Sequence, residues 1–382
     1  MSATARLEAE NAIPLRAPRR LMFLWGLPHG LVPAASVALY FLLDGANWTL
    51  LIPFVWTYMA VPALDTIIGE DITSPPETDY EALAADRYYT HVVFATLPMY
   101  FISFVAAMYV LGTQTVPLWA AAPFVFAVGL ASGQTITLAH ELGHRTEKFD
   151  RLFANISLAL IGMGHFCIEH NRGHHVRVAT PEDCSSARMN ETVYGFAFRD
   201  MTGAAMGAWE HEAKRLKARG KGFFSLENEI LQSYALTVVI AAALVAWLGW
   251  DVLPFILIHH FFGFLVLSMV NYIEHYGLKR EKLPNGKYEP CQPHHSWNAN
   301  HVVSNILSVN LQRHSDHHAN AMRPYQCLRN FPDLPRLPTG YAGCFTLITF
   351  PPLWFKVMNP KVREWAGGDE SKINWGPEKE AA

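Results

Sequence analysis

Six long apolar stretches constrain the fold of this 382-residue chain more than any other feature. Each is long enough to cross about 30 Å of hydrocarbon as a helix. Because only helices and closed barrels satisfy their own backbone in lipid, the stretches predict an all-α, polytopic membrane protein with six transmembrane helices. The expected spans are 21–43, 47–68, 89–111, 117–138, 230–249 and 252–273.

The connections between the stretches predict the topology. Very short links join spans one and two, three and four, and five and six, so long segments emerge on one side only. Arg16, Arg19 and Arg20 precede the first span, and the positive-inside rule then places that side in the cytoplasm. We expect a cytoplasmic N-terminal segment (1–20), a single integral membrane domain (21–366) and a polar, loosely ordered tail (367–382). The short apolar stretch 152–168 is expected to be interfacial or re-entrant.

Histidines gather in motifs that fall on this same side of the membrane. "HELGH" begins at residue 140, "EHNRGHH" at 169 and "HSDHH" at 314, and a further histidine follows the sixth span in "NYIEHYGL". Residues i and i+4 share a helix face, so the first motif can direct two imidazoles at one ion. The nine candidate ligands are His140, His144, His170, His174, His175, His275, His314, His317 and His318.

Nine imidazoles favour two metal ions over one. A zinc protease with a His-Glu-x-x-His motif needs three protein ligands, so His140, Glu141 and His144 alone would leave most of the cluster unexplained. Imidazole suits iron, copper and zinc, and the five cysteines form no Cys-x-x-Cys pair that would indicate a thiolate site. The excess of histidine therefore predicts a nitrogen-rich di-iron centre at the membrane surface.

Carboxylates within the motifs are candidates for orienting these ligands. A metal-bound histidine commonly donates its second N–H to a carboxylate or a carbonyl. For each candidate an ordinary salt bridge is the competing interpretation. The candidates are Glu141, Glu169, Asp183, Glu274 and Asp316.

The motifs together resemble the membrane alkane 1-monooxygenases, within the histidine-rich superfamily of membrane desaturases and hydroxylases. The similarity rests on "HELGHR", "EHNRGHH", "NYIEHYGL" and "LQRHSDHH", and on "LDTIIGED", "LENEIL", "PHHSWN" and "LPTGYAGCF". It extends from about residue 20 to 375. Arg145 replaces a common lysine and "PEDCSS" (181–186) departs from the pattern, but neither change touches a ligand position.

The resemblance implies an enzyme of the bacterial inner membrane with both termini and a di-iron cap in the cytoplasm. The implied reaction is O2-dependent terminal hydroxylation of medium-chain n-alkanes to 1-alkanols, with two iron ions held by the nine histidines and no other catalytic side chain. Rubredoxin and its reductase are the implied electron donors. The lipid bilayer would supply the apolar substrate, and the net charge of −3 gives no indication of nucleic-acid binding.

Two further residues and one segment are expected to have functional roles. Asn271, one helical turn before His275, resembles the asparagine that holds a metal-bound water in membrane desaturases. Trp56 lies mid-span, about 18 Å from the end of the span near Ile68, and is expected to limit the alkane channel. The basic segment 211–222 is expected to dock acidic rubredoxin, with a helix facing solvent or lipid headgroups as the alternative.

Other functions remain open from the residues alone. A fatty-acyl desaturase or another lipid hydroxylase would share the three histidine motifs. An intramembrane zinc metalloprotease would use only the first. A metal transporter would place its ligands inside the spans, whereas these histidines gather at one surface.

Overall fold

The structure is a computed structural model and describes residues 17–377. Most of the expected N-terminal segment, including Arg16, and the last five residues of the expected tail lie outside this part of the chain. Within residues 17–377 the regular structure is helical, and extended backbone forms only isolated bridges. The predicted all-α fold is confirmed.

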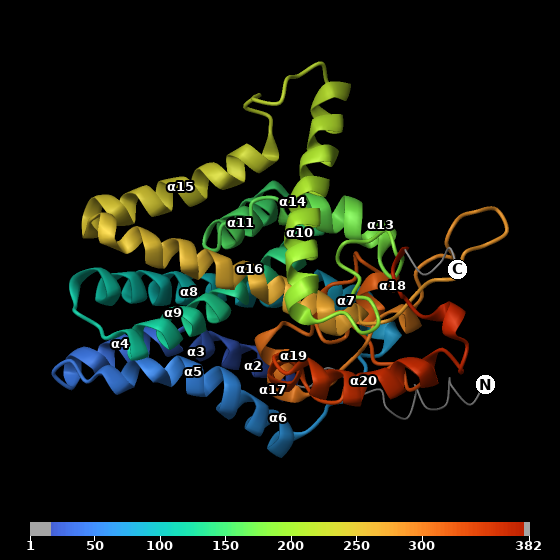
Figure 1. The fold of residues 1–382 in the computed structure, drawn as a ribbon, viewed down its shortest axis with the longest axis horizontal. Coiled ribbons are helices and arrows are strands. Elements are labelled where there is room, and N and C mark those ends of the chain that lie inside the picture. The colour runs from blue at the N-terminus through green and yellow to red at the C-terminus, as the bar shows by residue number, and fades with distance from the viewer. Residues whose placement is uncertain (1–16, 378–382) are drawn as a thin grey trace.

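Helices long and apolar enough to cross a membrane form an elongated bundle (Figure 1). The part of the chain that the structure describes has five such continuous helices, or six when a bent pair is taken as one span. The bent pair joins Arg20–Gly30 to Val32–Leu42 (α4) at 44°. Pro33 stands at the start of α4 and has no N–H to continue the helical ladder, which explains the break. The continuous spans are Asn47–Ile68, Arg87–Thr113 (α8), Leu118–Gly143, Glu229–Leu248 (α15) and Trp250–His275.

The predicted spans agree with these helices to within a few residues, because apolar length is a local property of the sequence. The second span is the least regular. It runs through a 3-10 turn (Asn47–Leu51), α5 (Ile52–Val55), a π turn (Trp56–Ala60) and α6 (Val61–Ile68). Pro62 cannot donate to the preceding turn, and the π turn accommodates it.

Close packing of two spans brings the histidine-bearing ends together. A Cβ on Gly129 of α9 (Leu118–Gly133) would lie 2.6 Å from the Cβ of Phe262 in α16 (Leu253–His275). A Cβ on Gly133 would lie 2.5 Å from Val266. Small residues of this kind let transmembrane helices approach closely. α9 continues into α10 (Thr135–Gly143), so His140 and His275 end on the same side of the bundle.

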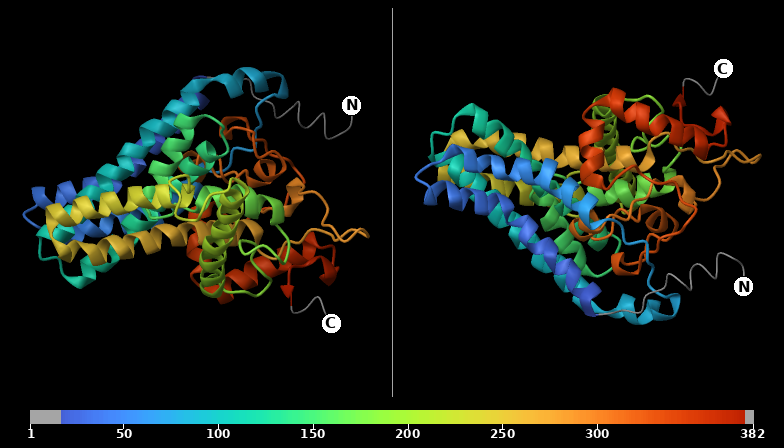
Figure 2. Two further views of the ribbon diagram at one scale, coloured as in Figure 1. Left: turned by 90° about the horizontal axis from the view of Figure 1, so that it is seen from above. Right: turned by 90° about the horizontal axis from the view of Figure 1, so that it is seen from below.

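Beyond these ends, further helices form a cap (Figure 2). Stretch 152–168, expected to be interfacial or re-entrant, contributes to two short helices that are not among the candidate spans. The cap helices are α7 (Tyr80–Ala85), α11 (Lys148–Ala159), α12 (Phe166–Glu169), α13 (His175–Arg177), α14 (Val193–Ala218), α17 (Val302–Leu307), α18 (His314–Ala319), α19 (Tyr341–Ile348) and α20 (Pro351–Trp365).

The end of the described part of the expected tail packs against the cap, whereas residues 367–372 are exposed. Ile373 and Asn374 are buried. The backbone N–H of Asn374 donates to the carbonyl of Gly277, and the N–H of Met189 donates to the carbonyl of Asn374. Because residues 367–377 are mostly polar, the burial of Ile373 and Asn374 was not predicted from the sequence.

Candidate metal centre

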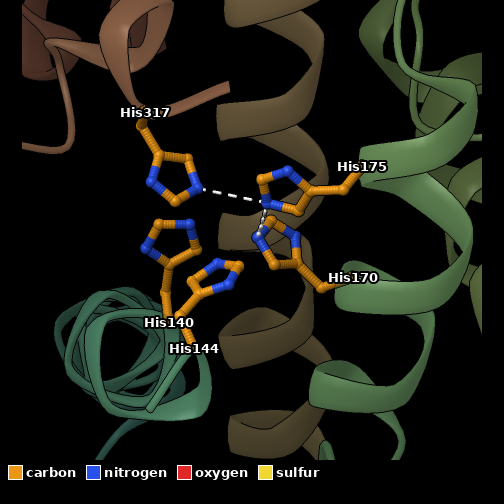
Figure 3. A group of neighbouring side chains, drawn as sticks. All are labelled: His140, His144, His170, His175 and His317. Carbon is orange, nitrogen blue, oxygen red and sulfur yellow. Dashed lines mark hydrogen bonds between the residues drawn. The ribbon is translucent and has the colours of Figure 1, made fainter. Parts of the chain in front are cut away.

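Five histidines from three parts of the chain form the first of two ligand groups (Figure 3). His140 and His144 come from the end of α10, His170 from the π turn after α12, His175 from the start of α13, and His317 from α18. One ligand atom from each lies within 4.8 Å of all the others. The Nε2 atoms of His170 and His175 are 3.0 Å apart, and those of His175 and His317 are 3.1 Å apart.

The second group takes the other four predicted ligands: His174, His275, His314 and His318. Their ligand atoms also lie within 4.8 Å of one another, and all four side chains are buried. The Nε2 atoms of His314 and His318 are 2.8 Å apart. All nine candidates from the sequence therefore fall into two clusters, five in one and four in the other.

A π turn determines this division. The N–H of His175 donates to the carbonyl of His170, five residues back, across the turn His170–His174. In a regular α-helix, residues i and i+4 would share a face, which would pair His170 with His174. The wider turn instead pairs His170 with His175 and directs His174 to the second group. Single π turns of this kind often occur at functional sites.

The donor atoms of both groups fit metal ions. The buried Nε2 atoms of His140, His144, His174 and His275 have no hydrogen-bond partner within the protein. Buried polar atoms normally have partners, so four converging exceptions require an explanation that a bound cation supplies. Lone pairs on neutral imidazoles, without thiolates, suit a transition metal such as iron.

Burial keeps these imidazoles in the form that binds metal. It lowers the pKa of His144 to about 4. Burial, and after it the proximity of other histidines, holds the pKa of His170 and His317 well below the usual value. A neutral ring can offer its lone pair, whereas a protonated one cannot.

Two of the predicted carboxylates contact histidines of the second group. Asp183 Oδ2 lies 3.0 Å from Nδ1 of His174, on the side of the ring opposite the converging Nε2 atoms. Burial alone would raise the pKa of Asp183, but His174 and the hydrogen bonds from His174 and Ser186 outweigh it and lower this pKa to about 2. Glu274 is fully buried, with Oε2 3.0 Å from Nε2 of His314 and with Oε1 accepting from the hydroxyl of Tyr341.

The other predicted supporting residues have different partners. Glu141 accepts from Arg145 at 2.7 Å and from the backbone of Tyr325 at 3.1 Å. Glu169 accepts from Arg177 at 2.5 Å. Asp316 accepts a hydrogen bond from Arg329. The side-chain amide of Asn271 donates to Asp200 over 3.3 Å.

An apolar cavity leads from the bundle to both groups. It is lined by His29, Thr57 and Val61 from the first two spans, and by His140, His170 and His314 from the two ligand groups. Most of its other lining side chains are aliphatic or aromatic, among them Leu130, Ile136, Phe166, Val266, Leu267 and Phe345. Asn271 and Glu274 also line it.

Trp56 is half-buried and is not among the residues that line the cavity. Its indole N–H instead donates to Nδ1 of His29 over 2.8 Å, and His29 forms the cavity wall. His29 was not predicted from the sequence, although an ionisable residue inside a span is by itself a functional signal. Asp200 was not predicted either; it accepts buried hydrogen bonds from the hydroxyls of Ser185 and Ser268, which lie far from it in the sequence.

A third group, made of Glu289, His294 and His295, does not fit a metal as well. Nδ1 of His295 accepts from the backbone N–H of Gln292, so the ring proton is on Nε2, which donates to Glu289. Neither nitrogen of this ring retains a free lone pair. The two large groups are thus the candidate metal centre of the described residues.

Comparison with known proteins places this arrangement in a family. A family model described as fatty acid desaturase matches residues 117–346. An alkane 1-monooxygenase of Alcanivorax borkumensis is 46% identical over 349 residues, covering 90% of this chain and 86% of its own. Alkane 1-monooxygenases of Ectopseudomonas oleovorans and Pseudomonas putida are 45% and 46% identical, over 92% and 89% of this chain and 88% and 85% of their own.

Proposed function

Because the chain belongs to the alkane 1-monooxygenase family, within the fatty acid desaturase superfamily, we propose that it hydroxylates the terminal methyl group of medium-chain n-alkanes. O2 is the co-substrate, and the products are a 1-alkanol and water. One observation carries the proposal: a cavity with apolar walls is lined by His140, His170 and His314, which belong to the two histidine groups. An alkane offers only apolar surface for binding, and only its end would reach the histidines.

The proposed cofactor is two iron ions, one in each ligand group. Iron bound there would supply the activation of O2. The protein contributes nine imidazole ligands, a carboxylate at Asp183 that fixes the ring of His174, and walls that exclude water. A buried, preorganised site of this kind positions one end of the substrate without needing a polar group on it.

The electrons are proposed to come from rubredoxin and its reductase. Hydroxylation by O2 consumes two electrons, and the sequence has no Cys-x-x-Cys pair for an iron–sulfur centre of its own. The enzyme is proposed to lie in the bacterial inner membrane with the cap and both termini in the cytoplasm, where these soluble donors are found.

The proposal is tested with purified enzyme in bilayers, supplied with rubredoxin, its reductase and NADH. With octane or dodecane we expect 1-octanol or 1-dodecanol by gas chromatography, and we expect no product when rubredoxin is omitted. A desaturase or lipid hydroxylase would instead modify an acyl chain and leave the alkane unchanged, which would contradict the proposal.

A zinc protease built on His140, Glu141 and His144 is less compatible with the structure. Its glutamate would have to act as a free general base. Here both carboxylate oxygens of Glu141 accept hydrogen bonds, one from Arg145 and one from the backbone of Tyr325. The family membership and the other seven histidines also favour the monooxygenase.

Replacing Trp56 by serine is expected to shift the substrate preference toward longer alkanes. The change removes the indole ring and the N–H that holds His29 in the cavity wall. His29 would then be free to turn aside, and the volume of the ring would become available to the chain. Product yields across a series from hexane to hexadecane measure the shift, and short alkanes should be bound less well.

Trp56→Phe is the matched control, because it keeps most of the ring volume and removes only the hydrogen bond. A profile intermediate between those of the parent and the serine variant would assign part of the effect to His29. Unchanged chain-length profiles in both variants would show that Trp56 and His29 do not limit the cavity.

A further inference from the structure

Helix α14 lies across the bundle, not along it. In Figure 1 the spans run horizontally and α14 stands nearly perpendicular to them, and both views in Figure 2 place it at the histidine-bearing ends of the spans. Its inner face is buried against α12 and α16 through residues such as Phe196, Ala204 and Ala208. A helix in this position runs parallel to the membrane plane at the boundary between bundle and cap.

The outer face of α14 carries an apolar stripe. Tyr194, Phe198, Met206 and Trp209 are spaced so that they fall on one side of the helix, and their exposed fractions are 61%, 75%, 66% and 46%. Thr202 continues the same row and is also exposed. Large apolar side chains in a continuous exposed row mark a surface that contacts something other than water.

The loop after α14 shows which side of the helix faces the bilayer. Trp209 stacks on Phe223 with ring centroids 3.6 Å apart. Phe224 and Leu226 follow, with 88% and 93% of their surfaces exposed, directly before α15 begins at Glu229. Because α15 is a candidate span, the loop and the stripe lie together at the plane where that span would enter the membrane.

Basic residues border the apolar stripe. Lys214, Lys217, Arg219 and Lys221 are all exposed. They outnumber their acidic partners Glu210 and Glu227, which lie 3.3–3.9 Å from three of them. Arg215 does not belong to this set, because it is turned inward against Glu212 at 2.6 Å.

We propose that α14 and the loop 219–228 form a lipid-binding surface on the histidine-bearing side of the membrane. Phe198, Trp209, Phe224 and Leu226 insert at the level of the acyl chains, and the four bordering cations contact anionic headgroups. Amphipathic helices with aromatic residues on one face and lysine or arginine beside it bind membrane interfaces in this way. The basic segment 211–222, expected from the sequence to dock rubredoxin, is thereby assigned to lipid.

The test is a depth measurement in vesicles of phosphatidylcholine and phosphatidylglycerol. A nitroxide is attached at Phe198→Cys or Phe224→Cys, and the unsubstituted protein treated in the same way gives the background of its native cysteines. We expect both nitroxides to be relaxed more strongly by O2, which concentrates in lipid, than by a water-soluble nickel chelate. Glu210→Cys is the matched control on the polar side of α14, and its nitroxide should show the reverse order.

The contribution of charge is measured in the same vesicles. Changing Lys214 and Lys217 to glutamate should make the Phe198 label shallower in anionic vesicles and leave its depth unchanged in pure phosphatidylcholine. The proposal is overturned if the labels at 198 and 224 favour the nickel chelate in both lipids. It is also overturned if they become protected only when rubredoxin is added, because the surface would then belong to a protein partner. Unchanged iron content shows that each variant has folded.

Discussion

Replacing His144 or His318 by alanine is expected to abolish alkane hydroxylation and to lower the iron content from the proposed two ions per chain toward one or none. Each variant removes a ligand from a different group, His144 from the group of five and His318 from the group of four. Each substitution leaves one ion with one imidazole ligand fewer. Elemental analysis of purified protein measures the iron, and gas chromatography measures the product.

His91→Ala is the control for loss of a histidine outside both groups, since His91 is an exposed residue of α8. It should keep its iron and its activity. If the His144 or His318 variant retained full iron and activity, the assignment of that ligand would be wrong. Active parent protein containing one zinc ion and no iron would remove the basis of the proposed di-iron centre.

Replacing Asp183 by asparagine is expected to weaken metal binding or activity by about 10–100-fold, the usual effect of removing a carboxylate behind a metal-bound histidine. Asp183 accepts from His174 and from Ser186, and it is almost fully buried. An amide carries no charge to strengthen the histidine as a donor, and it presents one acceptor oxygen where the carboxylate presents two. Competition with a coloured iron chelator measures the affinity apart from turnover.

Glu182→Gln provides the comparison, because Glu182 is the neighbouring residue and its side chain is exposed. This variant should match the parent in both its iron affinity and its hydroxylation activity. A normal iron affinity in Asp183→Asn would mean that the contact with His174 is structural only. Equal losses in both variants would point to a disturbance of the whole 181–186 loop.

The sequence predicted the spans and the set of clustered histidines because both depend on local properties. A long run of apolar residues predicts a span whatever its place in the fold. Histidines that directly follow span ends lie at one surface once the spans are packed together. It could not divide the nine histidines into groups. Their division depends on a π turn at His170–His174, and no residue in "HNRGH" requires one.

The residues that support the ligands were harder to predict, because a position beside a ligand in the sequence does not fix the direction in which the side chain points. Glu141 and Asp316 stand beside candidate ligands, yet each turns to an arginine, Arg145 or Arg329. Asp183 lies eight residues after His175 and nevertheless contacts His174. Trp56 was expected to limit the alkane channel, and the residue of this pair that lines the cavity is His29, which accepts from the indole N–H.

The two pairs of adjacent histidines also connect the ligand groups mechanically. His174 and His317 are each followed by a histidine that belongs to the other group. Neighbouring Cα atoms are about 3.8 Å apart across a trans peptide bond. Two separate backbone links, one in the π turn and one in α18, therefore fix the spacing of the groups, with no need for a shared bridging ligand. A backbone shift at either pair therefore moves ligands of both groups together, because the two histidines of each pair share a peptide bond.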